Sequence, residues 1–119
     1  MLSYESWWNK RYNSTKGIKN TTVMNPENLL KIRRKQILSI AKKHGAYDVR
    51  VFGSVARGDA RFDSDIDFLV KLEEGRSLLD LASLMREWQI LLDRDVDVIT
   101  DAGLRPRIRS QVLKEARSL

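Results

Sequence analysis

The stretch that decides the fold of this chain is GSVARGDARFDSDID, residues 53–67. Its Gly-Ser pair closes a run of alternating apolar residues over positions 47–52, and a second apolar run begins at its carboxyl end. This pattern predicts a strand, a tight turn with a short helix, and another strand. Because side chains i and i+2 of a strand share a face, we expect Asp65 and Asp67 to project together.

Two acids on one face of a sheet repel each other, and a divalent cation or a pair of basic side chains usually offsets the repulsion. The Gly-Ser pair favours the cation. Small residues at a strand-to-helix turn let backbone N–H groups approach a phosphate closely, and the Ser54 hydroxyl adds a donor. Phosphate and metal ligands on adjacent elements are what a nucleoside triphosphate with Mg²⁺ requires.

The spacing of Gly53-Ser54, ten residues and then Asp65-Ile66-Asp67 resembles the signature of the nucleotidyltransferases of the DNA polymerase β superfamily. A third carboxylate in that family lies on a later strand, and Asp97 matches it. The motif looks most like the minimal nucleotidyltransferase (MNT) type, and the resemblance covers roughly residues 26–119. It implies an α/β (α+β) fold, a small mixed β-sheet with helices packed against it.

The resemblance also implies roles for individual residues. Asp65, Asp67 and Asp97 would be catalytic and would hold two Mg²⁺ ions, with Asp97 also helping to deprotonate the acceptor hydroxyl. ATP would be the substrate, and its phosphates would be bound by Gly53, Ser54, Arg57 and Ser64.

Two of these assignments have alternatives within the sequence. Asp95 lies on the same strand parity as Asp97, nearer the strand entry, and is the second candidate for the third metal ligand. Arg57 would neutralise triphosphate charge one helical turn past the Gly-Ser pair, but it has the plainer alternative of a surface ion pair with Asp59 or Asp63.

The resemblance further implies a partner, because MNT proteins of this size are commonly the antitoxin of a pair whose toxin is a HEPN-domain ribonuclease. The chain would then transfer AMP from ATP to a tyrosine hydroxyl of the toxin. Two other functions stay open at this point. The chain could neutralise a toxin by complex formation without catalysis, or it could modify RNA or a small molecule.

Length and composition are consistent with one compact domain, since the chain has 119 residues. The net charge of +6 could meet nucleic acid or an acidic partner, although solvated helix faces explain it equally simply. Cysteine is absent, and neither a membrane-spanning run nor a signal-peptide pattern occurs, so we expect a cytoplasmic protein.

The elements expected within the domain are helices at about 26–44, 77–92 and 106–114, and strands at about 47–52, 65–71 and 95–100. The last residues would either finish the final helix or add an edge strand. Residues 1–25 show no helical or strand period and are expected to form an N-terminal extension. Either Met24 is the natural start, or Trp7 and Trp8 belong to an arm that docks on a partner.

Overall fold

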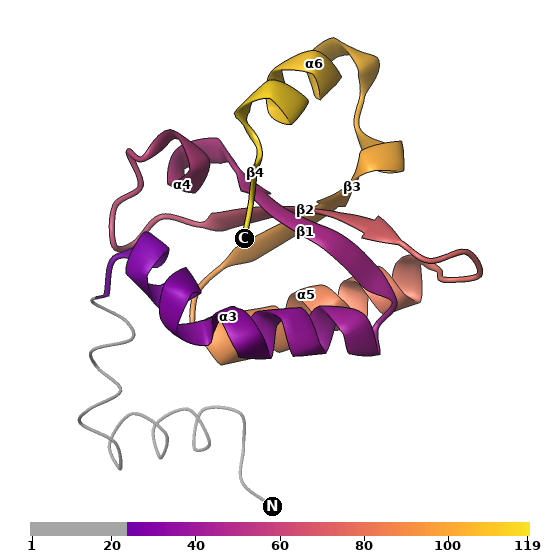
Figure 1. The fold of residues 1–119 in the computed structure, drawn as a ribbon, viewed down its shortest axis with the longest axis horizontal. Coiled ribbons are helices and arrows are strands. Elements are labelled where there is room, and N and C mark those ends of the chain that lie inside the picture. The colour runs from indigo at the N-terminus through magenta and orange to yellow at the C-terminus, as the bar shows by residue number, and fades with distance from the viewer. Residues whose placement is uncertain (1–23) are drawn as a thin grey trace, which may run out of the picture.

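The computed structural model describes residues 24–119, so the expectations for the N-terminal extension fall almost wholly outside the described residues. Those residues form, in order, α3 (Pro26–Lys43), β1 (Ala46–Phe52), α4 (Gly53–Arg57), β2 (Ile66–Leu72), α5 (Leu78–Leu92), β3 (Val96–Thr100), the 3-10 helix η2 (Asp101–Gly103), α6 (Pro106–Glu115) and β4 (Arg117–Ser118), as Figure 1 shows.

The strands form one four-stranded sheet in the order β3-β2-β1-β4. β1 runs antiparallel to β2 and to β4, whereas β2 and β3 run parallel to each other. A parallel pair needs a crossover connection, and α5 supplies it. The predicted fold class, a small mixed sheet with helices packed against it, is confirmed. The chain end takes the second of its two expected forms, the short edge strand β4.

The main core lies between the sheet and the pair α3 and α5, which cover the same face (Figure 1). Even-numbered residues of β2 point into it, and they are fully buried: Ile66, Phe68 and Val70. The helices meet them with Leu29, Leu30, Ile37, Ala41, Leu84, Trp88 and Leu92. No helix within residues 24–119 combines the length and the apolar character that crossing a membrane would require.

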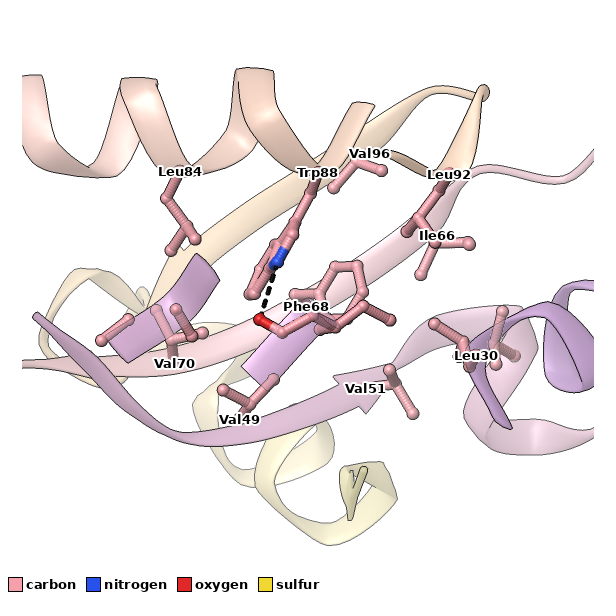
Figure 2. Close-up of a cluster of buried hydrophobic side chains, with 14 of the residues drawn as sticks. Leu30, Val49, Val51, Ile66, Phe68, Val70, Leu84, Trp88, Leu92 and Val96 are labelled. Atoms are coloured by element: carbon pink, nitrogen blue, oxygen red, sulfur yellow. Dashed lines mark hydrogen bonds between the residues drawn. The ribbon is translucent and has the colours of Figure 1, made fainter. Parts of the chain in front are cut away.

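Trp88 of α5 contacts both α3 and the sheet (Figure 2). Its ring lies against Phe68 with the ring centroids 4.2 Å apart. Its indole N–H donates a hydrogen bond of 3.1 Å to the backbone carbonyl of Ile37 in α3. Because a buried indole N–H without an acceptor would be costly, this bond makes burial of the whole side chain possible.

The opposite face of the sheet carries a smaller core, covered by α6 (Figure 1). Leu69 of β2 packs there with Leu104 and Val112, and Ile99 of β3 joins them. Odd-numbered residues of β2 and β3 therefore face α6, since alternate side chains of a strand share a face. The next odd positions toward the start of each strand are acidic, which sets the place of the candidate site.

Local signals in the sequence predict several element ends: Asn25 before Pro26 predicts an N-cap, Ser77 with Asp80 a capping box, and Gly45 after His44 the end of a helix. The Asn25 side chain accepts a hydrogen bond from the Glu27 backbone N–H, which confirms it as the N-cap of α3. Ser77 and Asp80 form the capping box of α5, although the box prefers Glu or Gln at the latter position. His44 is the C-cap of α3, as expected from its place before Gly45.

One expectation about the core was wrong. The many apolar residues at positions 78–92, Leu78 among them, predict burial of a wide face of this helix, but the Leu78 side chain is 80% exposed and that of the neighbouring Leu79 is 79% exposed. The buried stripe of α5 repeats every four residues through Leu84, Trp88 and Leu92. Leu78 lies about 80° around the helix from Trp88, the centre of that stripe, and Leu79 lies about 180° from it, because successive residues turn by about 100°. Apolar density in a helix does not by itself give the direction of its buried face.

Replacement of Trp88 tests this packing. We expect Trp88→Ala to lower the free energy of unfolding by about 3–5 kcal/mol, because it leaves a cavity between α3, α5 and the sheet. Trp88→Phe should cost less, since it keeps a ring against Phe68 and loses the hydrogen bond to Ile37. Urea unfolding followed by circular dichroism measures both. Leu79→Ala on the exposed side of α5 is the control and should cost less than about 0.5 kcal/mol. A Trp88→Ala cost as small as the control's would contradict the core described here.

Candidate active site

Asp67 and Asp97 occupy directly paired positions of the two parallel strands. The β2–β3 register aligns Ile66 with Val96, and therefore the two acids with each other. Both lie on the face of the sheet that α6 covers, at the ends of the strands where Leu69 and Ile99 give way to acidic residues. The predicted convergence of these two acids follows from the register alone.

Asp65 lies just ahead of β2, because the strand begins at Ile66 and not at residue 65 as expected. The backbone still continues the ladder, since the Ile66 N–H donates to the Asp95 carbonyl at 3.1 Å. Asp65 is exposed, and so is Asp97. β3 likewise begins one residue later than expected, at Val96, so Asp95 lies outside it with an exposed side chain.

The negative charges of Asp65, Asp67 and Asp97 repel one another. Burial, together with the negative charges of Asp97 and Asp65, raises the pKa of Asp67 from its ordinary 3.8 to about 6, and burial is the largest cause. A hydrogen bond between the Asp67 and Asp97 side chains adds to the effect, and the positive charge of Arg57 opposes it. Asp97, and not the alternative Asp95, is thus the β3 acid that contributes to this cluster.

The Gly-Ser turn packs directly against Asp67. Phe52, the residue before Gly53, lies opposite Asp67 in the β1–β2 register, which brings the turn next to the carboxylate. The φ angle of Gly53 is +72°, in the region that favours glycine. A Cβ on Gly53 would lie 2.4 Å from Oδ2 of Asp67, well inside van der Waals contact. The turn therefore needs glycine both for its backbone conformation and for its approach to the carboxylate. Ser54 follows as the second residue of α4.

Glu115, the last residue of α6, is a member of the site that the sequence reasoning missed. Its Oε1 accepts a hydrogen bond of 2.7 Å from the Gly53 backbone N–H and another of 3.2 Å from Nη1 of Arg57. Its side chain is 17% exposed. One signal could have drawn attention to it, because Glu115 is the sole acid among the many basic residues after Asp101.

Arg57 and Ser64, the remaining predicted nucleotide-binding residues, already have partners. Arg57 is half exposed and pairs with Asp59 at 3.3 Å as well as with Glu115, so the ion pair with Asp59 is present. These carboxylates raise the pKa of Arg57 above its usual range, with the hydrogen bond to Asp59 as the larger cause. The Ser64 hydroxyl accepts a hydrogen bond of 2.8 Å from the Arg61 backbone N–H, which fixes the loop before β2.

The chemistry of the donor set suits a hard divalent cation. Mg²⁺ prefers oxygen ligands, and its charge would remove the repulsion that raises the pKa of Asp67. Within residues 24–119, however, no group of three or more His, Cys, Asp or Glu side chains stands ready in the geometry of a metal site.

Comparison with known proteins identifies the family. The family model of the nucleotidyltransferase domain matches residues 33–119. A protein of Methanocaldococcus jannaschii, provisionally named a protein adenylyltransferase, is 43% identical over 75% of this chain and 95% of its own length. The protein adenylyltransferase MntA of Thermococcus cleftensis is 36% identical over 75% of this chain and 87% of that protein.

Solved structures agree with this result. A structure provisionally described as a minimal nucleotidyltransferase is 54% identical, with a TM-score of 0.71 over 78% of this chain and 95% of that one. Two others show a similar fold at lower identity. A toxin–antitoxin complex with AMP-PNP is 21% identical with a TM-score of 0.61, over 78% of this chain and 71% of that one. A tri-AMPylated Shewanella oneidensis HEPN toxin in complex with MNT antitoxin is 18% identical with a TM-score of 0.58, over 74% of this chain and 69% of that one. The chain belongs to the nucleotidyltransferase domain family, among minimal nucleotidyltransferases whose relatives are named protein adenylyltransferases.

Proposed function

We propose that this chain is a Mg²⁺-dependent protein adenylyltransferase that transfers AMP from ATP to a hydroxyl of a partner protein. The observation that carries the proposal is the register of β2 and β3, which pairs Asp67 with Asp97 next to the Gly53 turn. Carboxylates on one element and a glycine-serine turn on the adjoining one suit a metal-bound triphosphate. The membership of the nucleotidyltransferase family supports the same reaction class.

The acids have distinct proposed roles. Asp65, Asp67 and Asp97 would hold the two metal ions, and Asp97 would also help to deprotonate the acceptor hydroxyl. When bound, the two ions would stabilise the negative charge that develops on the attacking and leaving oxygens. The rise in the pKa of Asp67 supports its role, since it reflects a negative cluster that a cation would neutralise.

The phosphates would lie against the turn that starts α4. The backbone of Gly53 and the hydroxyl of Ser54 would hold the β- and γ-phosphates, and Arg57 would neutralise part of their charge. Ser64 would hold the loop that precedes β2, and through it the position of Asp65. Together these groups would orient the triphosphate for attack by the acceptor hydroxyl.

In the reaction, the acceptor hydroxyl oxygen would form a bond to the α-phosphorus while the bond from that phosphorus to the β-phosphate oxygen breaks. AMP becomes attached to the acceptor, and pyrophosphate leaves. The hydroxyl proton would pass to Asp97, whose exposed position lets an acceptor carried by another protein reach it. The chain itself only needs to position reactants and neutralise charge.

The proposed acceptor is a tyrosine of a HEPN-domain toxin, which would make this chain the antitoxin of a toxin–antitoxin pair. The named activity of the relatives supports protein as the acceptor class. The similar fold in complexes of HEPN toxin with MNT antitoxin supports the partner. Neutralisation by complex formation alone, or transfer to RNA or a small molecule, would each give a different result in the assays below.

Single substitutions of the acids test the catalytic assignment. Incubation with ATP, Mg²⁺ and a purified HEPN-domain partner should add AMP units to the partner, read by intact-protein mass spectrometry. Asp65→Ala, Asp67→Ala and Asp97→Ala should each slow the transfer at least about 100-fold, because each removes a proposed metal ligand.

Asp95→Ala is the matched control on the same strand entry, and it should keep the rate within about threefold, since the substitution leaves the backbone bond from Ile66 to its carbonyl intact. Equal losses for Asp95→Ala and Asp97→Ala would contradict the assignment of the third ligand. Full partner neutralisation by Asp65→Ala without any AMP transfer would favour the non-catalytic antitoxin.

The raised pKa of Asp67 predicts how pH affects the metal-free protein. A carboxyl whose pKa is raised by folding destabilises the fold as pH rises through that pKa, which here is about 6. Asp67→Asn should therefore raise the melting temperature at pH 7.5 without metal, by roughly 4 °C after allowance for its partial exposure. The gain should shrink as the pH falls below about 6 and vanish only below 3.8, where the carboxyl is protonated in the folded and the unfolded chain alike.

Thermal unfolding in a chelator measures this effect, and Glu74→Gln in the exposed loop after β2 is the control. Mg²⁺ should bring wild type up to the variant at pH 7.5, since the cation relieves the same repulsion. A lower melting temperature for Asp67→Asn under these conditions would show that the three acids do not repel one another.

A further inference from the structure

The Glu115 carboxylate lies where the triphosphate would bind if the proposed function holds. Its Oε1 is bonded both to the Gly53 backbone N–H, at 2.7 Å, and to Nη1 of Arg57, at 3.2 Å. These are two of the donors assigned to the phosphates. A carboxylate oxygen and a phosphate oxygen are anionic acceptors of the same kind, and both favour backbone N–H groups and guanidinium groups.

The charges around this contact show why both anions cannot use it together. Asp65, Asp67 and Asp97 already form a negative cluster against the Gly53 turn. Arg57 is the cation that acts on Asp67, and its guanidinium is shared between Asp59 and Glu115. A triphosphate that arrived with Glu115 in place would meet a fourth carboxylate and a neutralised arginine.

Glu115 is placed so that it can withdraw without unfolding the domain. It is the last residue of α6, and the chain after it is held to β1 by the β4 pairing, in which Arg117 lies opposite Val51, and by the Leu119 N–H, which donates to the Val49 carbonyl at 3.2 Å. The buried contacts of α6 are made by Val112 and lie one turn earlier. Rotation of the Glu115 side chain would free both donors and leave those contacts intact.

We infer that Glu115 competes with the triphosphate for the Gly53 N–H and Arg57, and thereby sets the affinity of this chain for its nucleotide. In the free protein Glu115 satisfies the turn and keeps Arg57 oriented. Nucleotide binding exchanges one anion for the other, and the cost of that exchange weakens binding. The inference rests on the proposed function, because it assigns the same turn to the phosphates.

The opposite role for Glu115 makes a different prediction. A residue that only positions the turn would strengthen binding, so its removal would weaken it. Glu115→Gln separates the two roles, because the amide oxygen can still accept from the Gly53 N–H while the negative charge is gone. Glu115→Ala removes both the charge and the acceptor, and it gives a second measurement on a variant with the same charge change.

The experiment is calorimetric titration of a non-hydrolysable ATP analogue with Mg²⁺ into each purified variant at pH 7.5, with circular dichroism to verify the fold. We expect Glu115→Gln to bind roughly 3- to 10-fold more tightly than wild type. Asp59→Asn removes the other carboxylate on Arg57 but does not touch Gly53, so its gain should be smaller. Glu74→Gln carries the same charge change in the exposed loop after β2 and should leave the affinity unchanged.

Unchanged or weaker binding by Glu115→Gln and Glu115→Ala, with wild type binding normally, would overturn the inference and leave the proposed function standing. A gain for Asp59→Asn as large as that for Glu115→Gln would also overturn it, since loss of charge near Arg57 would then be the whole cause. Failure of wild type and of every variant to bind the nucleotide would overturn the proposed function and the inference together.

Discussion

The constraint on which the site depends is the parallel register of β2 and β3, which sets Asp67 and Asp97 side by side. Two carboxylates at paired positions, with Asp65 close by, raise the free energy of the ionised site and the pKa of Asp67. The rest of the sheet offsets that cost through the apolar residues on its other face. A cation bound among these carboxylates would relieve the repulsion.

The segments around this pair give the site its shape. α3 and α5 bury the even-numbered side chains of β2, so the odd-numbered ones, including Asp67, must face α6. β1 delivers the Gly53 turn to the same edge, where only glycine fits against the Asp67 carboxylate. The C-terminal segment then returns across the sheet and places Glu115 on that turn. The site is therefore satisfied by hydrogen bonds at the Gly53 turn, and its three aspartates repel one another.

The site could be predicted from the sequence where chemically distinctive residues lie close together in the chain. The period of two in residues 65–70 separated the acids from the buried face, and the Gly-Ser pair marked the turn that meets them. Asp97 could be found because its strand alternates acidic and apolar residues, although only the strand register distinguishes it from Asp95. The fold class followed from the same strands and from helix caps such as Asn25.

Contacts between residues that lie far apart in the chain could not be predicted from the sequence. Glu115 lies 62 positions from Gly53, and no local period relates the two residues. The burial of Leu78 was wrongly predicted, because the number of apolar residues in α5 shows that the helix is buried but not which of its sides faces the sheet. Arg57 shows a third case, since its sequence position fits a phosphate ligand and an ion pair equally well, and the free protein has the ion pairs.

The central claim is that Asp65, Asp67 and Asp97 together bind the metal that accompanies the nucleotide. A crystal structure of this chain with Mn²⁺ and a non-hydrolysable ATP analogue tests it most directly, because anomalous scattering locates the ion without reference to the protein. Manganese should be bound between the carboxylates of Asp67 and Asp97, with the phosphates against Gly53. Manganese held elsewhere, or an Asp97 carboxylate turned away from an occupied site, would contradict it.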